Sequence, residues 1–114
     1  MTPSERKKYP LYSGLLRYFP NALMAVAHCS WIGNEQHNPG SELHWDRSKS
    51  GDEADALMRH LLESGTVDTD GVRHSTKCAW RALALLEKEI EHETEKSNQE
   101  NDEQSRTRRE ALDL

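Results

Sequence analysis

Apolar residues recur every three or four positions in three stretches of the chain, and polar stretches separate them. This spacing places apolar side chains along one face of a helix, and it predicts helices over residues 22–32, 52–63 and 71–92. A shorter helix or turn is expected over residues 10–19. The fold class is therefore all-α, a small helical bundle of three main helices plus a short N-terminal helix. The predicted core positions are Leu23, Val26, Ala27 and Ile32, then Ala54, Leu57, Met58, Leu61 and Leu62, and finally Ala79, Ala82, Leu83, Leu86 and Ile90.

Several residues mark where these helices should begin and end. Pro20 should break the first segment, because its ring clashes with the preceding helical turn. Asn21 is a plausible N-cap for the next helix. Gly33 is the natural stop of that helix, since glycine readily adopts the left-handed conformation that ends helices. Ser50 or Gly51 should cap the third segment.

The composition limits what these helices can bury. The chain has 114 residues and a hydrophobic share of 34%, which is low for a globular domain. The core must be small, so we expect a homo-oligomer, a dimer or a tetramer, to complete it. The net charge is -5, and most of it lies after residue 90. No broad basic face is indicated, which argues against duplex nucleic acid as a partner.

Three segments of the chain differ in character. Residues 1–9 should be flexible, residues 10–91 should form the folded domain, and residues 92–114 should be a frayed helix or a disordered polar tail. Cys29 and Cys78 lie in apolar patterns without CxxC spacing, which favours reduced, buried thiols. No long apolar run predicts a signal peptide or a membrane span, so a cytoplasmic location is expected.

Candidate chemistry gathers between the second and the last helix, mainly in the expected connection over residues 33–50. The Asn38-Pro39-Gly40 run predicts a turn, and long connections between helices are commonly functional. Carboxylates in this region suit Mg²⁺ or Mn²⁺, which prefer oxygen ligands. Alternatively, the same acids only cap helices. The acidic candidates are Glu35, Glu53, Asp55, Asp68 and Asp70, with His60 nearby.

Cationic residues in the same region suit phosphate groups. Arginine makes bidentate contacts to phosphate oxygens and lysine supplies a point charge. The alternative is that these side chains only keep the surface soluble or pair along a helix. The candidates are Arg47, Lys49 and Arg59, followed on the last helix by Lys77 and Arg81.

A third set of residues has the chemistry to bind a nucleobase. Amides read the edges of purines, and an aromatic face stacks on them. Asn38 could instead make the turn, and Trp45 could fill the small core. No Ser or Cys lies in a nucleophile-elbow context, and the histidines lack HxxxH spacing, so a zinc site is not favoured. The candidates are Gln36, His37, Asn38, His44 and Trp45.

Long motifs in this region resemble one known family. It is the dATP/dGTP diphosphohydrolase N-terminal domain family of short phage and bacterial proteins, and the similarity covers about residues 10–90. The chain is also similar, more distantly, to the all-α NTP pyrophosphatases of the MazG type. The motifs that carry the resemblance are Gly33-Asn34-Glu35-Gln36-His37-Asn38-Pro39-Gly40, His44-Trp45-Asp46-Arg47-Ser48-Lys49-Ser50, Arg59-His60-Leu61, Asp68-Thr69-Asp70-Gly71-Val72-Arg73-His74 and Ala79-Trp80-Arg81-Ala82-Leu83.

The resemblance implies cleavage of a purine deoxynucleoside triphosphate to the monophosphate and pyrophosphate, with Mg²⁺ or Mn²⁺ as the metal. MazG-type enzymes carry two ExxE or ExxD pairs on adjacent helices. The nearest analogues here are Asp52-x-x-Asp55 and the Asp68/Asp70 pair, and the helix ending at Ile32 has no carboxylate. This departure leaves a non-catalytic module that sequesters nucleotides as the alternative. A structural protein whose loop merely packs is a third possibility.

On the enzyme hypothesis, the ligand should lie between the loop over residues 34–45 and the third helix. The phosphates should point toward Arg59 and Lys49, and the base toward Trp45 and Gln36. Trp80 marks either a subunit contact or an aromatic that covers the last helix. The expected catalytic residues are Glu35, Glu53 and His60. The expected metal ligands are Glu53, Asp55, Asp68 and Asp70. The expected substrate-binding residues are Gln36, His37, Asn38, His44, Trp45, Arg47, Lys49, Arg59 and His74.

Overall fold

The computed structural model describes residues 1–49 and 51–112, and most of them are helical. Strand-like geometry within these residues is limited to one isolated bridge between Val67 and Arg73. The predicted all-α fold is confirmed. The elements in chain order are α1 (Pro3–Arg6), the π-helical turn η1 (Tyr12–Leu16), α2 (Pro20–His37), α3 (Glu53–Leu62) and α4 (His74–Leu112).

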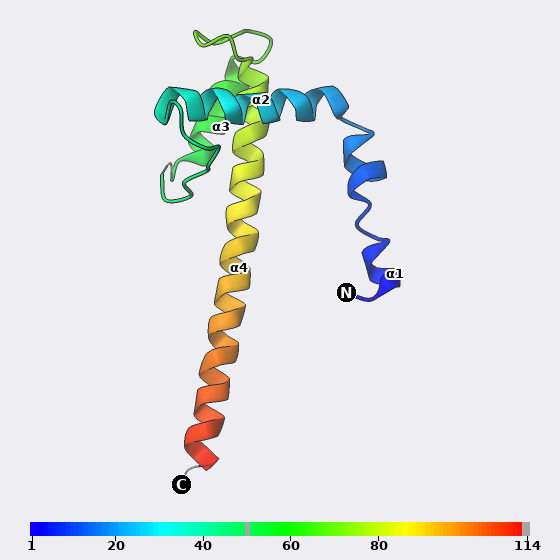
Figure 1. Cartoon of the computed structure of the whole chain (residues 1–114), viewed down its shortest axis with the longest axis vertical. Helices are drawn as coiled ribbons and strands as arrows, with labels where there is room; N and C mark the ends of the chain where they lie inside the picture. The colour runs from blue at the N-terminus through cyan, green and yellow to red at the C-terminus, as the bar shows by residue number, and fades with distance from the viewer. Residues whose placement is uncertain (50, 113–114) are drawn as a thin grey trace.

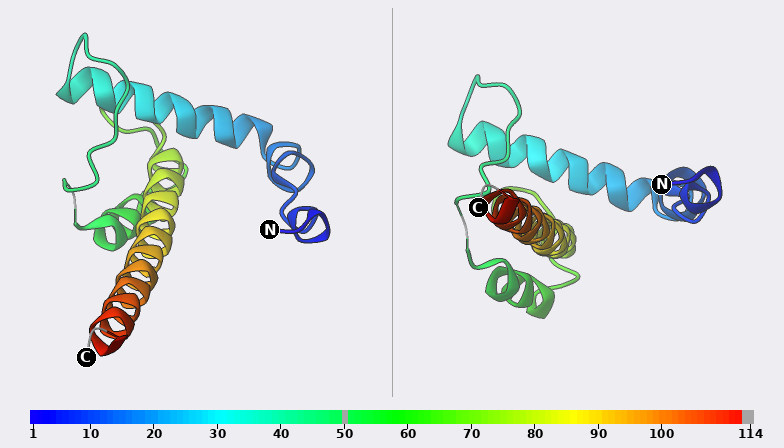
Figure 2. Two further views of the ribbon diagram at one scale, coloured as in Figure 1. Left: turned by 60° about the horizontal axis from the view of Figure 1, so that its bottom comes forward. Right: turned by 90° about the horizontal axis from the view of Figure 1, so that it is seen from below.

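Three helices form the body of the molecule, and α4 is its axis. In Figure 1, α2 crosses the first half of α4, α3 lies beside that same half, and the rest of α4 extends away alone. The views in Figure 2 agree, and they show the segment that carries α1 remote from α3 and α4. The molecule is accordingly long and narrow, with principal extents of 66 × 35 × 31 Å.

The second helix is longer than the sequence predicts at both ends. Pro20 is its first residue, where a missing N–H costs nothing, and Phe19 rather than Asn21 is the N-cap. The predicted stop at Gly33 is wrong, because the helix continues to His37. It ends there because Pro39 disfavours a helical conformation for the residue before it. As a result, Glu35, Gln36 and His37 lie on a helix instead of in a loop.

The third helix begins almost where it was expected. Its N-cap is Asp52, whose side chain makes no capping hydrogen bond, rather than Gly51. The other predicted cap, Ser50, lies outside the described residues. Glu53 and Asp55 occupy the first turn, where carboxylates favour the positive end of the helix dipole.

The last helix is much longer than expected. It begins at His74 and runs to Leu112, so the predicted end near residue 92 is wrong. Residues 92–112 contain neither glycine nor proline and are rich in Glu, Gln and Arg, which are good helix formers even without packing. Every residue from 92 to 111 is exposed. That this part is separate from the domain stays a prediction.

The core is small. The predicted apolar stripe of α4 does not contribute to it, and the predicted stripe of α3 is wrong at Met58, Leu61 and Leu62, which are exposed. Among the described residues, the buried hydrophobic side chains are Ala56, Val72 and Ala84. Leu83, Leu86 and Ile90 were predicted to be buried, yet their exposed fractions are 48%, 52% and 50%. The helix packs on the body through its opposite side, which carries Lys77, Trp80, Arg81, Ala84 and Lys88.

The segment before α2 contributes little to the body. The predicted short helix or turn is present there as the π-helical turn η1, and the large apolar side chains of this segment are exposed. No helix in the described ranges is both long enough and apolar enough to cross a membrane.

Candidate functional site

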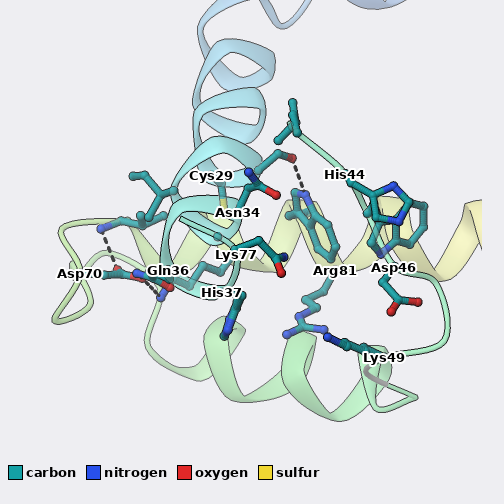
Figure 3. Close-up of a pocket in the computed structure, with 18 of the residues that line it drawn as sticks. Cys29, Asn34, Gln36, His37, His44, Asp46, Lys49, Asp70, Lys77 and Arg81 are labelled. Carbon is teal, nitrogen blue, oxygen red and sulfur yellow. Dashed lines mark hydrogen bonds and ion pairs between the residues drawn. The ribbon is translucent and has the colours of Figure 1, made fainter. Parts of the chain in front are cut away.

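A pocket of about 710 Å³ opens where α2, the loop after it, α3 and the inner side of α4 meet (Figure 3). This volume suits a small-molecule ligand. Eight predicted site residues line it, namely Gln36, His37, Asn38, His44, Trp45, Lys49, His60 and Asp70. The pocket formed by the described residues does not include Glu35, Arg47, Glu53, Asp55, Arg59, Asp68 or His74.

Two tryptophans form one wall of the pocket. The rings of Trp45 and Trp80 meet edge to face with their centroids 5.7 Å apart. The indole N–H of Trp80 donates to Ser30 Oγ on α2 at 2.7 Å, so Trp80 makes an intramolecular contact. The guanidinium of Arg47 lies 4.2 Å from the ring centre of Trp45 and pairs with Glu91 at 2.9 Å. Arg47 therefore covers the Trp45 ring while it is held to α4.

A tight turn between α3 and α4 brings two aspartates to the pocket's edge. The turn closes through Gly71, whose φ of 82° is accessible to glycine at little cost. Lys77 Nζ on α4 donates to Asp68 Oδ2 and to Asp70 Oδ2, both at 2.7 Å. The amide of Gln36 on α2 donates to Asp70 Oδ2 at 3.3 Å. One hydrogen-bonded network thus joins α2, the turn and α4.

This network favours the ionised form of both aspartates. The hydrogen bond from Lys77 lowers the pKa of Asp68 to about 2. The same donor lowers the pKa of Asp70.

Three cationic side chains line the pocket, and the sequence-based site included one of them, Lys49. The sequence named the other two, Lys77 and Arg81, as phosphate-binding candidates on the last helix but did not include them among the expected substrate-binding residues. Figure 3 shows Lys49 and Arg81 pointing to the same end of the pocket, with Lys77 beside Asp70 at the other end. The periodicity of α4 could have identified the pair, because Lys77 and Arg81 lie one helical turn apart.

Asn34 is a further pocket residue that sequence reasoning missed. Its side chain is buried on α2, and its amide donates to the carbonyl of Ser41 at 3.1 Å. Its Oδ1 accepts no hydrogen bond from the described part of the chain. A buried acceptor without a donor is costly, so a ligand that carries an N–H group would satisfy it.

The acidic residues predicted to hold a metal do not converge. Glu53 is buried and accepts a hydrogen bond from Lys88 Nζ at 2.8 Å, which lowers the pKa of the Glu53 carboxyl group. Asp55 is exposed on α3. Asp68 and Asp70 share Lys77 as described above. Arg59 points outward and pairs with Asp52 at 3.4 Å.

Among the described residues, the donors that converge are two histidines and one aspartate. His60 Nδ1 and His74 Nδ1 lie 2.8 Å apart. One ligand atom each from His60, Asp68 and His74 lies within 4.8 Å of the others. Burial lowers the pKa of His60, which favours the neutral ring that metals bind. This donor set fits a divalent cation better than the scattered carboxylates do.

Comparison with known proteins assigns the chain to a family. The family model described as "dATP/dGTP diphosphohydrolase, N-terminal" matches residues 3–99, which is most of the chain. The chain belongs to this family. No curated protein and no solved structure matches it.

Proposed function

We propose that this member of the dATP/dGTP diphosphohydrolase N-terminal family binds a purine deoxynucleoside triphosphate in the pocket and hydrolyses it to the monophosphate and pyrophosphate. Membership of the family supports a diphosphohydrolase activity. The observation that carries the proposal is the pocket itself, because it combines two indole rings, several amides and imidazoles, and three cations.

The base end of the ligand lies against the tryptophan wall in this proposal. Trp45 and Trp80 offer ring surface, and stacking on an indole contributes about 1–3 kcal/mol per base. Gln36, Asn38 and the unsatisfied Oδ1 of Asn34 supply the hydrogen-bonding groups that read a purine edge. An exocyclic amino group on the purine is the donor that Asn34 lacks.

The phosphate end lies toward Lys49, Lys77 and Arg81. In the reaction, the oxygen of water bonds to the α-phosphorus, the bond from that phosphorus to the bridging oxygen breaks, and pyrophosphate leaves with that oxygen. Fixed cations stabilise the charge that develops on the leaving group. The family's activity implies a divalent cation, and the residues that fit one are His60, Asp68 and His74. When bound, such an ion would polarise a phosphate oxygen.

A non-catalytic module that sequesters nucleotides is the second candidate. It is favoured by the dispersal of Glu53, Asp55, Asp68 and Asp70, which do not form the all-oxygen metal site of a MazG-type enzyme. Both candidates use the same pocket, so they differ only in whether bound nucleotide is turned over.

Release of pyrophosphate from dATP and from dGTP in the presence of Mn²⁺ tests the enzyme proposal. Arg81→Ala should lower kcat/KM by ten- to a hundred-fold, which corresponds to about 1–3 kcal/mol for a charge-assisted contact. Arg59→Ala is the matched control, because Arg59 is exposed and outside the pocket. Binding without pyrophosphate release would establish the sequestering module. Neither binding nor release would overturn both candidates.

We also propose that the active form is a homo-oligomer in which a second copy covers the outer side of α4. Leu83, Leu86 and Ile90 form an exposed apolar stripe there, and the buried core is small for a domain that folds alone.

A further inference from the structure

Three consecutive elements each bring one metal-ligating side chain to the junction of α3 and α4. His60 lies in the last turn of α3, Asp68 in the connecting turn, and His74 is the first residue of α4. We propose that His60, Asp68 and His74 bind one divalent transition-metal ion of the Zn²⁺ or Co²⁺ class, and that this ion binds whether or not nucleotide is present.

The two imidazole rings are already close to ligand geometry. Their Nδ1 atoms are joined by a hydrogen bond of 2.8 Å, and their ring centroids are 5.1 Å apart. Binding of the ion would release the shared proton and replace this hydrogen bond. Two nitrogens bound to one tetrahedral zinc, each at about 2.1 Å, lie roughly 3.4 Å from each other. The rings therefore need to separate by less than about 1 Å to admit the ion.

Neighbouring groups orient the ligands. Glu63 Oε2 lies 3.4 Å from His74 Nε2, so a proton on Nε2 faces a carboxylate and the lone pair of Nδ1 faces His60. This carboxylate–histidine arrangement is typical of metal sites. Asp68 is held by the backbone N–H of Thr69 at 2.7 Å and by Lys77 at 2.7 Å. The donor set is thus fixed in place by the fold itself.

The local charge also suits a cation. Lys77 is positive, but it pairs with both Asp68 and Asp70. Lys77 and the two aspartates therefore carry a net charge of −1. Imidazole ligands favour Zn²⁺, Co²⁺ and Ni²⁺, whereas Mg²⁺ favours oxygen ligands. The proposal therefore distinguishes this site from a magnesium site made of carboxylates alone.

The site borders the nucleotide pocket without depending on it. His60 lines the pocket, and His74 is buried and is not among the residues that line it. Because the ion contacts both α3 and α4, it should stabilise the fold in the absence of nucleotide. This inference rests on the proposed function for the role of the ion, but metal binding is measured without nucleotide, so its failure can be told apart from a failure of the hydrolase activity.

Titration of the full chain with Co²⁺ alone tests the proposal, monitored by visible d–d absorption and by calorimetry. We expect one ion per chain, a higher Tm with Co²⁺, and at least 100-fold weaker binding of Mg²⁺. His60→Ala should weaken Co²⁺ binding by at least 30-fold, and Asp68→Asn should weaken it as well. His92→Ala is the matched control, because His92 is exposed on α4, and it should bind Co²⁺ as the wild type does.

A positioning variant adds a second measurement. Glu63→Gln removes the charge beside His74 but leaves all three ligands, and it should weaken Co²⁺ binding by about 10-fold. Circular dichroism shows whether each variant keeps its helices. The proposal is overturned if helical His60→Ala binds Co²⁺ as tightly as the wild type, or if His92→Ala loses as much affinity as His60→Ala.

Discussion

The two sides of α4 between residues 74 and 91 show the reverse of the usual arrangement of an amphipathic helix. The side that packs on α2 and α3 carries Lys77, Trp80, Arg81 and Lys88, while the exposed side carries the apolar stripe that includes Leu86. A helix normally buries its apolar stripe in its own domain. Here the chain packs the side that carries these partly buried polar residues against the body and leaves the apolar side exposed.

The difference suggests a separate task for each side. The inner side is held by specific polar contacts, namely Lys77 to Asp70, Trp80 to Ser30 and Lys88 to Glu53. Buried polar contacts fix geometry because each unsatisfied group is costly, and this geometry shapes the pocket. The outer side has no such contacts in the described part of the chain, and it offers the apolar area that association requires.

The largest expected effect comes from placing a charge on the outer side. Leu86→Glu removes apolar area from the proposed contact and puts a carboxylate into it. In a symmetric pair the change occurs twice, so association should weaken by about 3 kcal/mol or more, which is more than roughly 100-fold. Light scattering at micromolar concentration should show a smaller mass for the variant than for the wild type.

Glu87→Gln on the same turn is the control for the outer side, because Glu87 is exposed but outside the apolar stripe. It should leave the mass unchanged. A wild-type chain that is monomeric at micromolar concentration would contradict the proposed oligomer directly.

A slightly smaller effect is expected on the inner side, and it should appear in the stability of the fold rather than in the mass. Lys88→Met keeps the aliphatic stem but removes the hydrogen bond to the buried Glu53 carboxylate. The loss should lower the free energy of unfolding by about 2–3 kcal/mol. Lys96→Met is the control, since Lys96 is exposed on the same helix. Equal stability of the two variants in urea would show that the Lys88–Glu53 pair is unimportant.

Periodicity predicted where the helices lie but could not say which side each helix buries. The stripe from Ala79 to Ile90 has correct helical spacing, and an isolated chain offers no reason to bury its opposite side. The burial of Ala84 depends on contacts with α3, whose own inner side is set by Glu53 and Ala56. One sequence does not show whether such a stripe is buried in its own chain or, as proposed here, by a second copy.

The proposed base-binding part of the site was more accessible to sequence reasoning than the proposed metal part. Gln36, His37 and Trp45 lie close together in the chain, and a short segment next to a helix end brings them to one pocket. His60 and His74 are fourteen positions apart, and the turn closed by Gly71 brings them together. The spacing of the histidines along the sequence therefore could not predict this cluster.

The inner side also predicts how stability depends on pH. The hydrogen bond from Lys88 lowers the pKa of the Glu53 carboxyl group from its usual 4.5, with Arg81 also nearby. Such a group stabilises the fold above the pKa of the unfolded chain, and this contribution is lost as the pH falls through the folded pKa. Urea unfolding at pH 7, 5 and 4 should show a smaller acid-induced loss for Glu53→Gln than for the wild type.

The same variant examines the predicted catalytic role of Glu53. Normal pyrophosphate release by Glu53→Gln would restrict that residue to stability. Loss of release with nucleotide binding intact would support the catalytic prediction. An acid-induced loss of stability equal to that of the wild type would contradict the ion-pair explanation.

The smallest effect is expected from the second half of α4, which has neither a packed side nor an apolar stripe. Residues 92–111 are exposed all round and pack on nothing in the described chain, so their burial contributes almost no free energy. Truncation after Glu91 should remove helical signal in circular dichroism and change Tm by less than about 4 °C. Nucleotide binding should be unchanged, because the pocket lies entirely before residue 82. A loss of oligomer mass in the truncated chain would instead assign the association to this polar half and would contradict the role proposed for the outer side of α4.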